Sequence, residues 1–281
     1  MEWLTANKLP LGKWIKDRVE WLLDHATHIF DAFSEAVEWL IESTIDGMLW
    51  LHPLVLVAIF AAIAFGLHRS WKLVLLVVAS LLLVINLGYW EDTIQTLGLV
   101  LFATLVCVLL GIPLGILAAH RPWLQQVLRP LLDLMQTIPT FVYLIPTMIM
   151  FGLGVVPGLI STVIFALPAP VRLTILGVAS VPKPLIEAGQ SFGATRWQLL
   201  WKVELPHALP TIMAGVTQCI MLSLSMVVIA AMVGAPGLGI PVLRALNTVN
   251  IAKGFEAGLA IVIVAILLDR VCKQPATGER S

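Results

Sequence analysis

The chain is 281 residues long, and 59% of its residues are hydrophobic whereas only 12% are charged. Soluble domains carry about 25% charged residues, so this composition excludes an ordinary globular protein and predicts a polytopic helical membrane protein. Basic and acidic residues balance at 17 each and form no basic stripe, so we expect no binding to nucleic acid. The first residues lack a basic flank before an apolar run, so we expect no cleavable signal peptide.

Residues 1–48 are predicted to form an acidic, amphipathic segment on the outer side of the membrane. Apolar residues recur there at steps of three and four, and acidic residues recur on the opposite face. Several tryptophans suit a membrane interface. Two interpretations stay open: a brace packed on the helix bundle, or a docking surface for a partner outside. The apolar positions are Leu22, Ala26, Ile29, Phe33, Val37 and Leu40.

Seven long apolar segments follow, and we predict that each crosses the membrane. Pro168 and Pro170 interrupt the fifth, so a kink is expected near its cytoplasmic end. The amphipathic residues 124–135, before the fourth, are expected to run along the inner membrane face. A tail, residues 273–281, follows the last span. The seven segments are residues 49–67, 73–89, 97–119, 138–154, 158–180, 208–233 and 254–268.

The distribution of basic residues predicts the orientation. With the N-terminus outside and the C-terminus inside, eleven lysines and arginines lie inside and two, Arg244 and Lys253, lie outside, leaving the N-terminal segment aside. The inner residues are Arg69, Lys72, Arg121, Arg129, Arg172, Lys183, Arg196, Lys202, Arg270, Lys273 and Arg280.

The loop between the fifth and sixth spans, residues 181–206, is polar and carries both charge signs. Pro184 near its start predicts a short helix, and Glu187 is expected in the first turns of that helix. Gly193 is expected to allow a close approach or a backbone conformation that a side chain would block.

The second half of the loop predicts another short helix. Residues 194–202 are expected to cross the first helix, and Leu205 and Pro206 are expected to end the piece and turn the chain toward the membrane. Two helices hinged at a glycine predict a rigid knob for a groove on a soluble protein. Phe192 or Trp197 is the expected apolar anchor, because aromatic residues dominate such contacts.

The loop pattern E-A-x-x-x-x-G, then nine residues, then [IV]-x-L-P resembles the cytoplasmic EAA loop of permease subunits in ABC importers. The third position of the motif is Gly189 instead of alanine, which affects local helix stability. Five further stretches look like the permeases of glycine betaine, proline betaine and choline importers, and the similarity covers roughly residues 50–272. These stretches are residues 136–146, 165–168, 172–177, 191–194 and 222–230.

The resemblance implies an all-α, type I ABC importer permease fold of about seven transmembrane helices, with the permease domain at 49–272, in a bacterial inner membrane. It implies a homodimer, two ATP-binding subunits and a separate substrate-binding protein. The chain is then no enzyme and holds no cofactor, since ATP and magnesium bind the partner ATPase; no G-x-x-x-x-G-K-[ST] occurs. The residues expected at the ATPase contact are Glu187, Ala188, Gly189, Phe192, Gly193, Ala194, Trp197, Leu205 and Pro206.

The translocation path is predicted from chemistry. Aromatic faces attract quaternary ammonium groups, so Phe141 and Tyr143 are candidates to line the path; packing in the bundle is the alternative. Polar residues in the spans face either the path or neighbouring helices. The glycine-rich segment 233–241 is expected at the outer gate through Gly234, Gly237 and Gly239. The polar path candidates are Gln136, Thr137, Gln218, Ser223 and Ser225.

Two other classes of membrane protein are weaker interpretations. A secondary transporter or a channel for small organic cations, not coupled to ATP, is the main alternative, but the span interiors hold almost no titratable residues and a channel leaves the polar loop unexplained. An intramembrane enzyme lacks a nucleophile–base or metal constellation. The three cysteines have no metal-binding spacing, and His25 and His28 lack a third ligand, so we expect no metal site.

Overall fold

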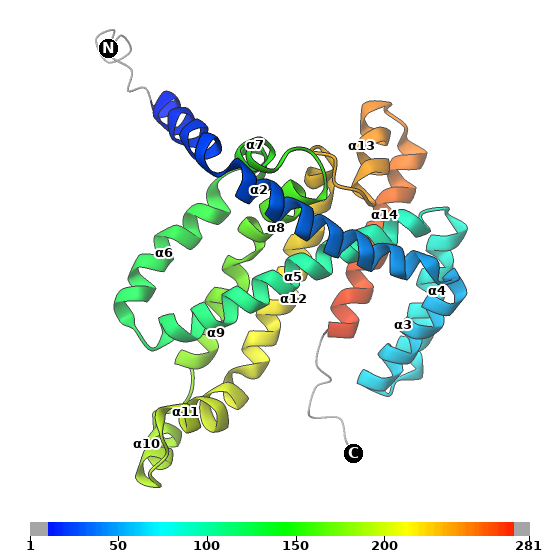
Figure 1. Ribbon diagram of the computed structural model, residues 1–281. Helices are drawn as coiled ribbons and strands as arrows, with labels where there is room; N and C mark the ends of the chain where they lie inside the picture. The colour runs from blue at the N-terminus through cyan, green and yellow to red at the C-terminus, as the bar shows by residue number, and fades with distance from the viewer. Residues whose placement is uncertain (1–10, 273–281) are drawn as a thin grey trace, which may run out of the picture.

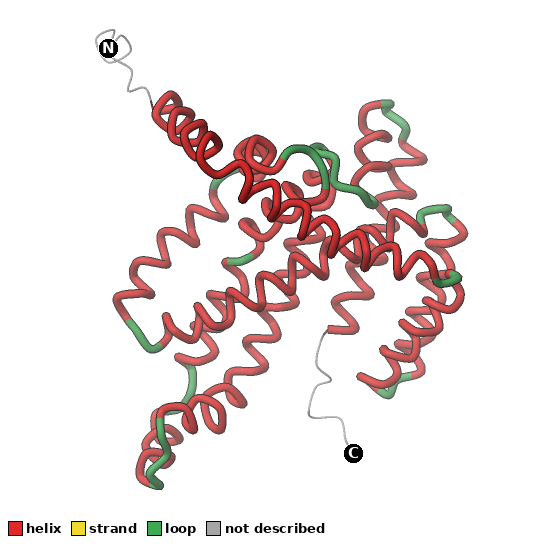
Figure 2. The backbone as a smooth tube through the Cα atoms, viewed as in Figure 1, coloured by secondary structure: helices red, strands yellow, loops and turns green. Residues whose placement is uncertain are grey.

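A computed structural model describes residues 11–272, and every regular element in that range is a helix (Figure 1, Figure 2). Four continuous helices within it are long and apolar enough to cross a membrane. The rest of the predicted seven correspond to the shorter apolar helix α4 (Trp71–Asn86) and two bent pairs of helices. The pairs are α2 (Leu11–Trp50) with α3 (Pro53–His68), and α6 (Pro122–Thr137) with α7 (Thr140–Phe151). The four are α5 (Trp90–Ala119), α8 with α9 (Val155–Ala179), α11 through α12 (Arg196–Ala231) and α14 (Ile251–Cys272).

The centre of the bundle is formed by α5, α9 (Pro168–Ala179) and α12 (Leu205–Ala231), which approach one another through small residues. A Cβ on Gly115 of α5 would lie 2.6 Å from the Cβ of Thr174. A Cβ on Gly215 of α12 would lie 3.2 Å from the Cα of Pro170. Only a hydrogen atom fits at these crossings, so helix association here depends on close backbone packing.

The fifth predicted span passes through its prolines as one helix. The α8 segment (Val155–Ala166) joins α9 at Leu167, whose backbone is still helical at φ −51° and ψ −37°. Pro168 stands in the first turn of α9, where its missing N–H is tolerated. The prolines thus fall at a joint between two helical segments, which together form one candidate span.

The N-terminal helix α2 (Leu11–Trp50) lies across one end of the bundle and meets α3 (Pro53–His68) at 105° (Figure 1). We call this the α2 end. The amphipathic helix is confirmed, but its predicted apolar face is displaced. Ile41 and Ile45 are buried, whereas Ile29 and Leu40 are exposed. Ile45 packs at Gly98 of α5, so tertiary packing selects a neighbouring face of the helix. The predictions for residues 1–10 and 273–281 lie outside the described residues.

The expectation that residues 124–135 lie along the inner membrane face is wrong. They belong to α6 (Pro122–Thr137), which runs back beside α5 and α9 toward the α2 end (Figure 1). Leu128 and Leu132 are buried in one cluster with Val171 and Ile175 of α9. The apolar face of α6 packs on this cluster and its polar face turns away, which explains its amphipathic sequence.

Residues 138–154, predicted as a span, instead contain α7 (Thr140–Phe151), bent by 95° from α6. Pro139 explains the bend: the preceding Ile138 is extended at ψ 131°, so α6 ends before the apolar run begins. The helix α7 packs against α2 and α8 at the α2 end. The amphipathic helix therefore lies beside α5 and α9, and its apolar neighbour bends away from them.

Candidate functional site

The polar loop folds into two short helices at the end of the bundle opposite α7 and α13 (Gly239–Asn247) (Figure 1). They are α10 (Lys183–Ser191) and α11 (Arg196–Leu199), and a π-helical turn, η1 (Leu200–Glu204), joins α11 to α12. We call residues 183–204 the knob. Glu187 is the fifth residue of α10, within the first turns in which it was expected.

Local hydrogen bonds determine the bend between α10 and α11. Gly193 adopts φ +78°, a left-handed conformation that favours glycine. Its N–H donates to Gln190 O at 2.9 Å, and the N–H of Ala194 donates to Gly189 O at 3.0 Å. These two bonds form a Schellman motif, which satisfies the last carbonyls of α10.

The next helix begins two residues later with a capping box. The side chain of Gln198 accepts from the N–H of Thr195 at 2.8 Å, and Thr195 Oγ1 accepts from the N–H of Gln198 at 3.3 Å. The bend is therefore encoded by residues within a few positions of each other. A Cβ on Gly193 would meet nothing within 4 Å, so this position points into open space in the single chain.

Gly189, the departure from the usual alanine, lies where α10 crosses α11. A Cβ there would come within 2.6 Å of Leu199 Cδ2, the far end of a flexible side chain. Leu199 is buried under this crossing. The glycine thus lets the two helices of the knob pack directly on each other.

The knob exposes large aromatic side chains. Phe192 is 92% exposed and Trp197 is 71% exposed, as an anchor for a partner would need to be. Trp201 in η1 is 64% exposed and was missed from the sequence. The sequence could have indicated Trp201, because it lies one helical turn after Trp197 and residues four apart share a helix face.

The expectation that Leu205 and Pro206 end the second helix is wrong. The helix continues from Arg196 to Ala231 through the wide turn of η1, in which the N–H of Leu205 donates to Leu200 O. A proline ring collides with the carbonyl four residues earlier in a regular α-helix. The π-turn immediately before Pro206 shifts the bonding register, and the helix passes through the proline. The knob is consequently continuous with the membrane helix α12.

A buried carboxylate lies at the base of the knob and was also missed. Glu204 is only 7% exposed, and its Oε2 lies 2.9 Å from Nε2 of His120 at the end of α5. This contact is an ion pair when the His120 imidazole is protonated. His120 Nδ1 donates to Ile116 O at 2.9 Å, since a carbonyl can only accept. This contact ties the start of α12 to α5.

The path candidates near α7 fall into two environments. Tyr143 is buried, and its hydroxyl donates to Met135 O at 2.7 Å, which joins α7 to α6. Phe141 is exposed beside it. Gln136 is half-buried, and Thr137 is exposed with its hydroxyl donating to Leu134 O at 3.3 Å. All four lie at or beyond the α2 end of α6.

The candidates on α12 do not share one face. Gln218 and Ser225 are exposed two turns apart, and Ser225 donates to Met221 O at 3.0 Å. Ser223 is fully buried on the opposite side. Their predicted contact with solute remains a prediction.

The predicted outer-gate segment is packed tightly at the α2 end. Gly234 and Gly237 adopt φ +91° and +118°. The N–H of Leu238 donates to Thr96 Oγ1 of α5 at 2.8 Å, and a Cβ on Gly237 would lie 2.5 Å from that oxygen. A Cβ on Gly239 would lie 2.3 Å from Val227 O. The expected helix break is confirmed, between the end of α12 and the start of α13.

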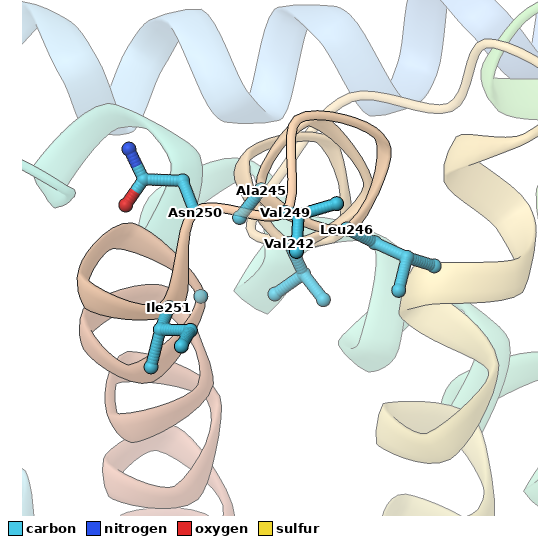
Figure 3. A pocket seen from close by; sticks show the side chains of 7 residues that line it. Val242, Ala245, Leu246, Val249, Asn250 and Ile251 are labelled. Carbon is cyan, nitrogen blue, oxygen red and sulfur yellow. The ribbon is translucent and has the colours of Figure 1, made fainter.

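A shallow apolar cavity of about 370 Å³ lies between α13 and α14 (Figure 3). Leu246, Val249 and Ile251 on its rim are largely exposed. Among residues 11–272, no three His, Cys, Asp or Glu side chains gather as a metal site would require. His25 uses Nδ1 to donate to Trp21 O at 2.8 Å in its own helix.

Comparisons with known proteins add to this geometry. The family described as "Binding-protein-dependent transport system inner membrane component" matches residues 111–271. The chain is 43% identical over 274 residues to the glycine betaine transport system permease protein OpuAB of Bacillus subtilis (strain 168), covering 98% of this chain and 97% of that protein. It is 45% identical over 270 residues to the glycine betaine/carnitine transport permease protein GbuB of Listeria monocytogenes serotype 1/2a (strain 10403S), covering 94% of each.

Solved structures are similar in fold. A chain of the MetNI methionine ABC transporter in an inward-facing conformation superposes with a TM-score of 0.57 at 23% identity, covering 64% of this chain and 90% of that chain. A second inward-facing crystal form gives a TM-score of 0.55.

Proposed function

The chain belongs to the family of binding-protein-dependent transport system inner membrane components, and from this premise we propose that it carries quaternary ammonium solutes of the betaine type into the cell. It is a membrane permease subunit of an ABC importer and not an enzyme. Relatives with 43–45% identity are described as permeases for glycine betaine, carnitine and proline betaine, which supports this solute class. A secondary carrier or channel is not favoured. Choline remains a further candidate within the class.

The proposed assembly contains two copies of this chain, two ATP-binding subunits and a separate substrate-binding protein. The observation that carries the coupling proposal is the knob: an exposed aromatic surface continuous with the membrane helix α12. A groove on an ATPase subunit that holds Phe192 and Trp197 would move α12 as a lever. ATP and magnesium would be bound by the ATPase subunits alone.

We place the knob in the cytoplasm and the α2 end outside, with the N-terminus out and the C-terminus in. The excess of basic residues at the knob end supports this orientation. ATP-driven closure of the ATPase subunits would draw two knobs together and open the path to the outside. Hydrolysis would then reset the inward-open state.

The test is reconstitution of the permease with its ATPase subunit and binding protein in liposomes. We expect ATP-dependent uptake of labelled glycine betaine and retention of the ATPase subunit during purification. Choline and an uncharged osmolyte serve as competing and control solutes. Uptake that continues without the ATPase subunit would contradict the proposal and favour a carrier or channel.

A further inference from the structure

The crossing helix α6 carries a line of polar side chains along its length. Gln125, Arg129, Asp133 and Gln136 follow one another at steps of four, four and three residues, which places them on one face of the helix. The neighbouring face buries leucines against α9 and α5. The polar line therefore extends from the knob end of α6 to the α2 end.

Such a line is incompatible with contact to lipid. An arginine or aspartate at the centre of a bilayer costs about 2.5–3.5 kcal/mol on insertion scales. Arg129 and Asp133 are both exposed in the single chain, so the chain itself does not cover them. In the membrane this face must border either water or another protein surface.

A basic residue from α9 joins the line. The Nη2 atom of Arg172 donates to Asp133 Oδ1 at 2.7 Å, and this ion pair joins α9 to α6. The side chains are 43% and 65% exposed, respectively. Exposed pairs of this kind contribute at most about 1 kcal/mol, so a solute that offers both charges can open the pair. Arg172 is seven residues before Ala179, the end of α9 that leads to the knob.

We propose that Arg172 and Asp133 form a transient binding site for zwitterionic quaternary amines on the translocation path, with the polar face of α6 as its wall. The proposal rests on the proposed function of the chain. The planar guanidinium of Arg172 matches a carboxylate in a two-bonded geometry. A quaternary ammonium has no N–H to donate, so Asp133 attracts it by charge alone.

The chemistry predicts a preference. A betaine replaces both partners of the open ion pair, whereas choline has no carboxylate for Arg172. Solute handed over by a binding protein needs only weak affinity here, because a tight site would slow its release. A pair that opens easily meets this requirement.

The experiment compares Arg172→Gln and Asp133→Asn with the wild type in the reconstituted complex. Arg270→Gln, an exposed arginine in the last turn of α14, is the matched control. We expect betaine uptake by either path variant to fall at least about tenfold, as removal of hydrogen bonds to charged groups predicts. ATP hydrolysis stimulated by the binding protein should stay within about twofold, so that betaine moved per ATP falls.

A charge-exchanged double variant, Arg172→Asp with Asp133→Arg, separates a binding site from a structural ion pair. It keeps the pair but reverses its direction, so we expect normal amounts of assembled complex and low uptake. Uptake restored to the wild-type level would overturn the proposal. So would dissociation of the two permease copies in Arg172→Gln, which would identify the polar line as an interface between copies. Failure of the wild type to transport betaine would instead refute the proposed function.

Discussion

The knob and the glycine-rich segment 233–241 are both built around glycines in left-handed conformations, but for different reasons. At the knob, Gly193 completes a local motif and faces open space. At the opposite end, Gly237 faces Thr96, a residue 141 positions earlier in the chain, and has no room for a side chain. The first glycine shapes the exposed surface that we propose for the ATPase subunit, and the second permits the packing of the protein itself. Substitutions at the two ends should therefore differ in kind.

The largest effect is expected from Gly193→Asp, which should abolish uptake while the protein stays folded in the membrane. An added carboxylate would enter the space that we propose for the ATPase groove, and misplacing one buried contact at such an interface costs about 2 kcal/mol or more. The measurement is betaine uptake together with pull-down of the ATPase subunit. Gly88→Asp is the matched control, since Gly88 also has a positive φ (+81°) and open space but lies in the α4–α5 turn. Normal transport by Gly193→Asp with the ATPase bound would contradict the role of the knob.

The next largest effect is expected from Gly237→Ala at the packed end. The new Cβ would lie 2.5 Å from Thr96 Oγ1 and 3.1 Å from the Thr96 N, and the backbone φ of +118° strains any L-residue. Overpacking of this type costs about 1–3 kcal/mol. We expect a smaller folded fraction and a lower melting temperature in detergent, with uptake reduced in proportion. An unchanged melting temperature combined with lost uptake would contradict the claim that Gly237, unlike Gly193, acts through the packing of the protein itself.

His120→Ala tests whether the contact at the base of the knob stabilises the fold, as the packing at Gly237 does, or only shapes an exposed surface, as Gly193 does. Removing the imidazole leaves the buried Glu204 carboxylate without its ionic partner, which costs about 1–3 kcal/mol. We expect a modest loss of thermal stability that the double variant His120→Ala with Glu204→Gln partly restores. If the double variant is no more stable than the single one, the contact does not stabilise the joint between α5 and α12.

The smallest effects are expected within α10. Glu187→Ala removes an exposed carboxylate from the middle of a short helix, and surface changes of this kind stay within about 0.5 kcal/mol. Gly189→Ala requires only that the tip of Leu199 move, and the gain in helix propensity offsets part of that strain. We expect both variants to keep more than about half of wild-type uptake. A severe loss in Gly189→Ala would show that the helix crossing in the knob tolerates no displacement.

The knob was largely predictable because its determinants are close in sequence. The helix start near Pro184, the bend at Gly193 and the exposed aromatics follow from rules that span a few residues. The helix through Pro206 was not predictable, since no sequence pattern indicated the π-turn that accommodates the proline. The His120–Glu204 contact joins residues 84 positions apart, which no local rule reports.

The sequence by itself determined that this protein is a helical membrane permease with a polar loop of defined shape, because apolar length, charge distribution and capping motifs are local quantities. Tertiary structure alone decided that amphipathic α6 crosses beside α9 while apolar α7 bends away, and which face of α2 is buried. Hydropathy measures how a segment prefers lipid to water. It does not report that a neighbouring helix can cover one face of a polar segment and leave the other face for a partner or a solute. For this reason hydropathy misplaced α6 and α7, whereas the tertiary structure shows where each packs.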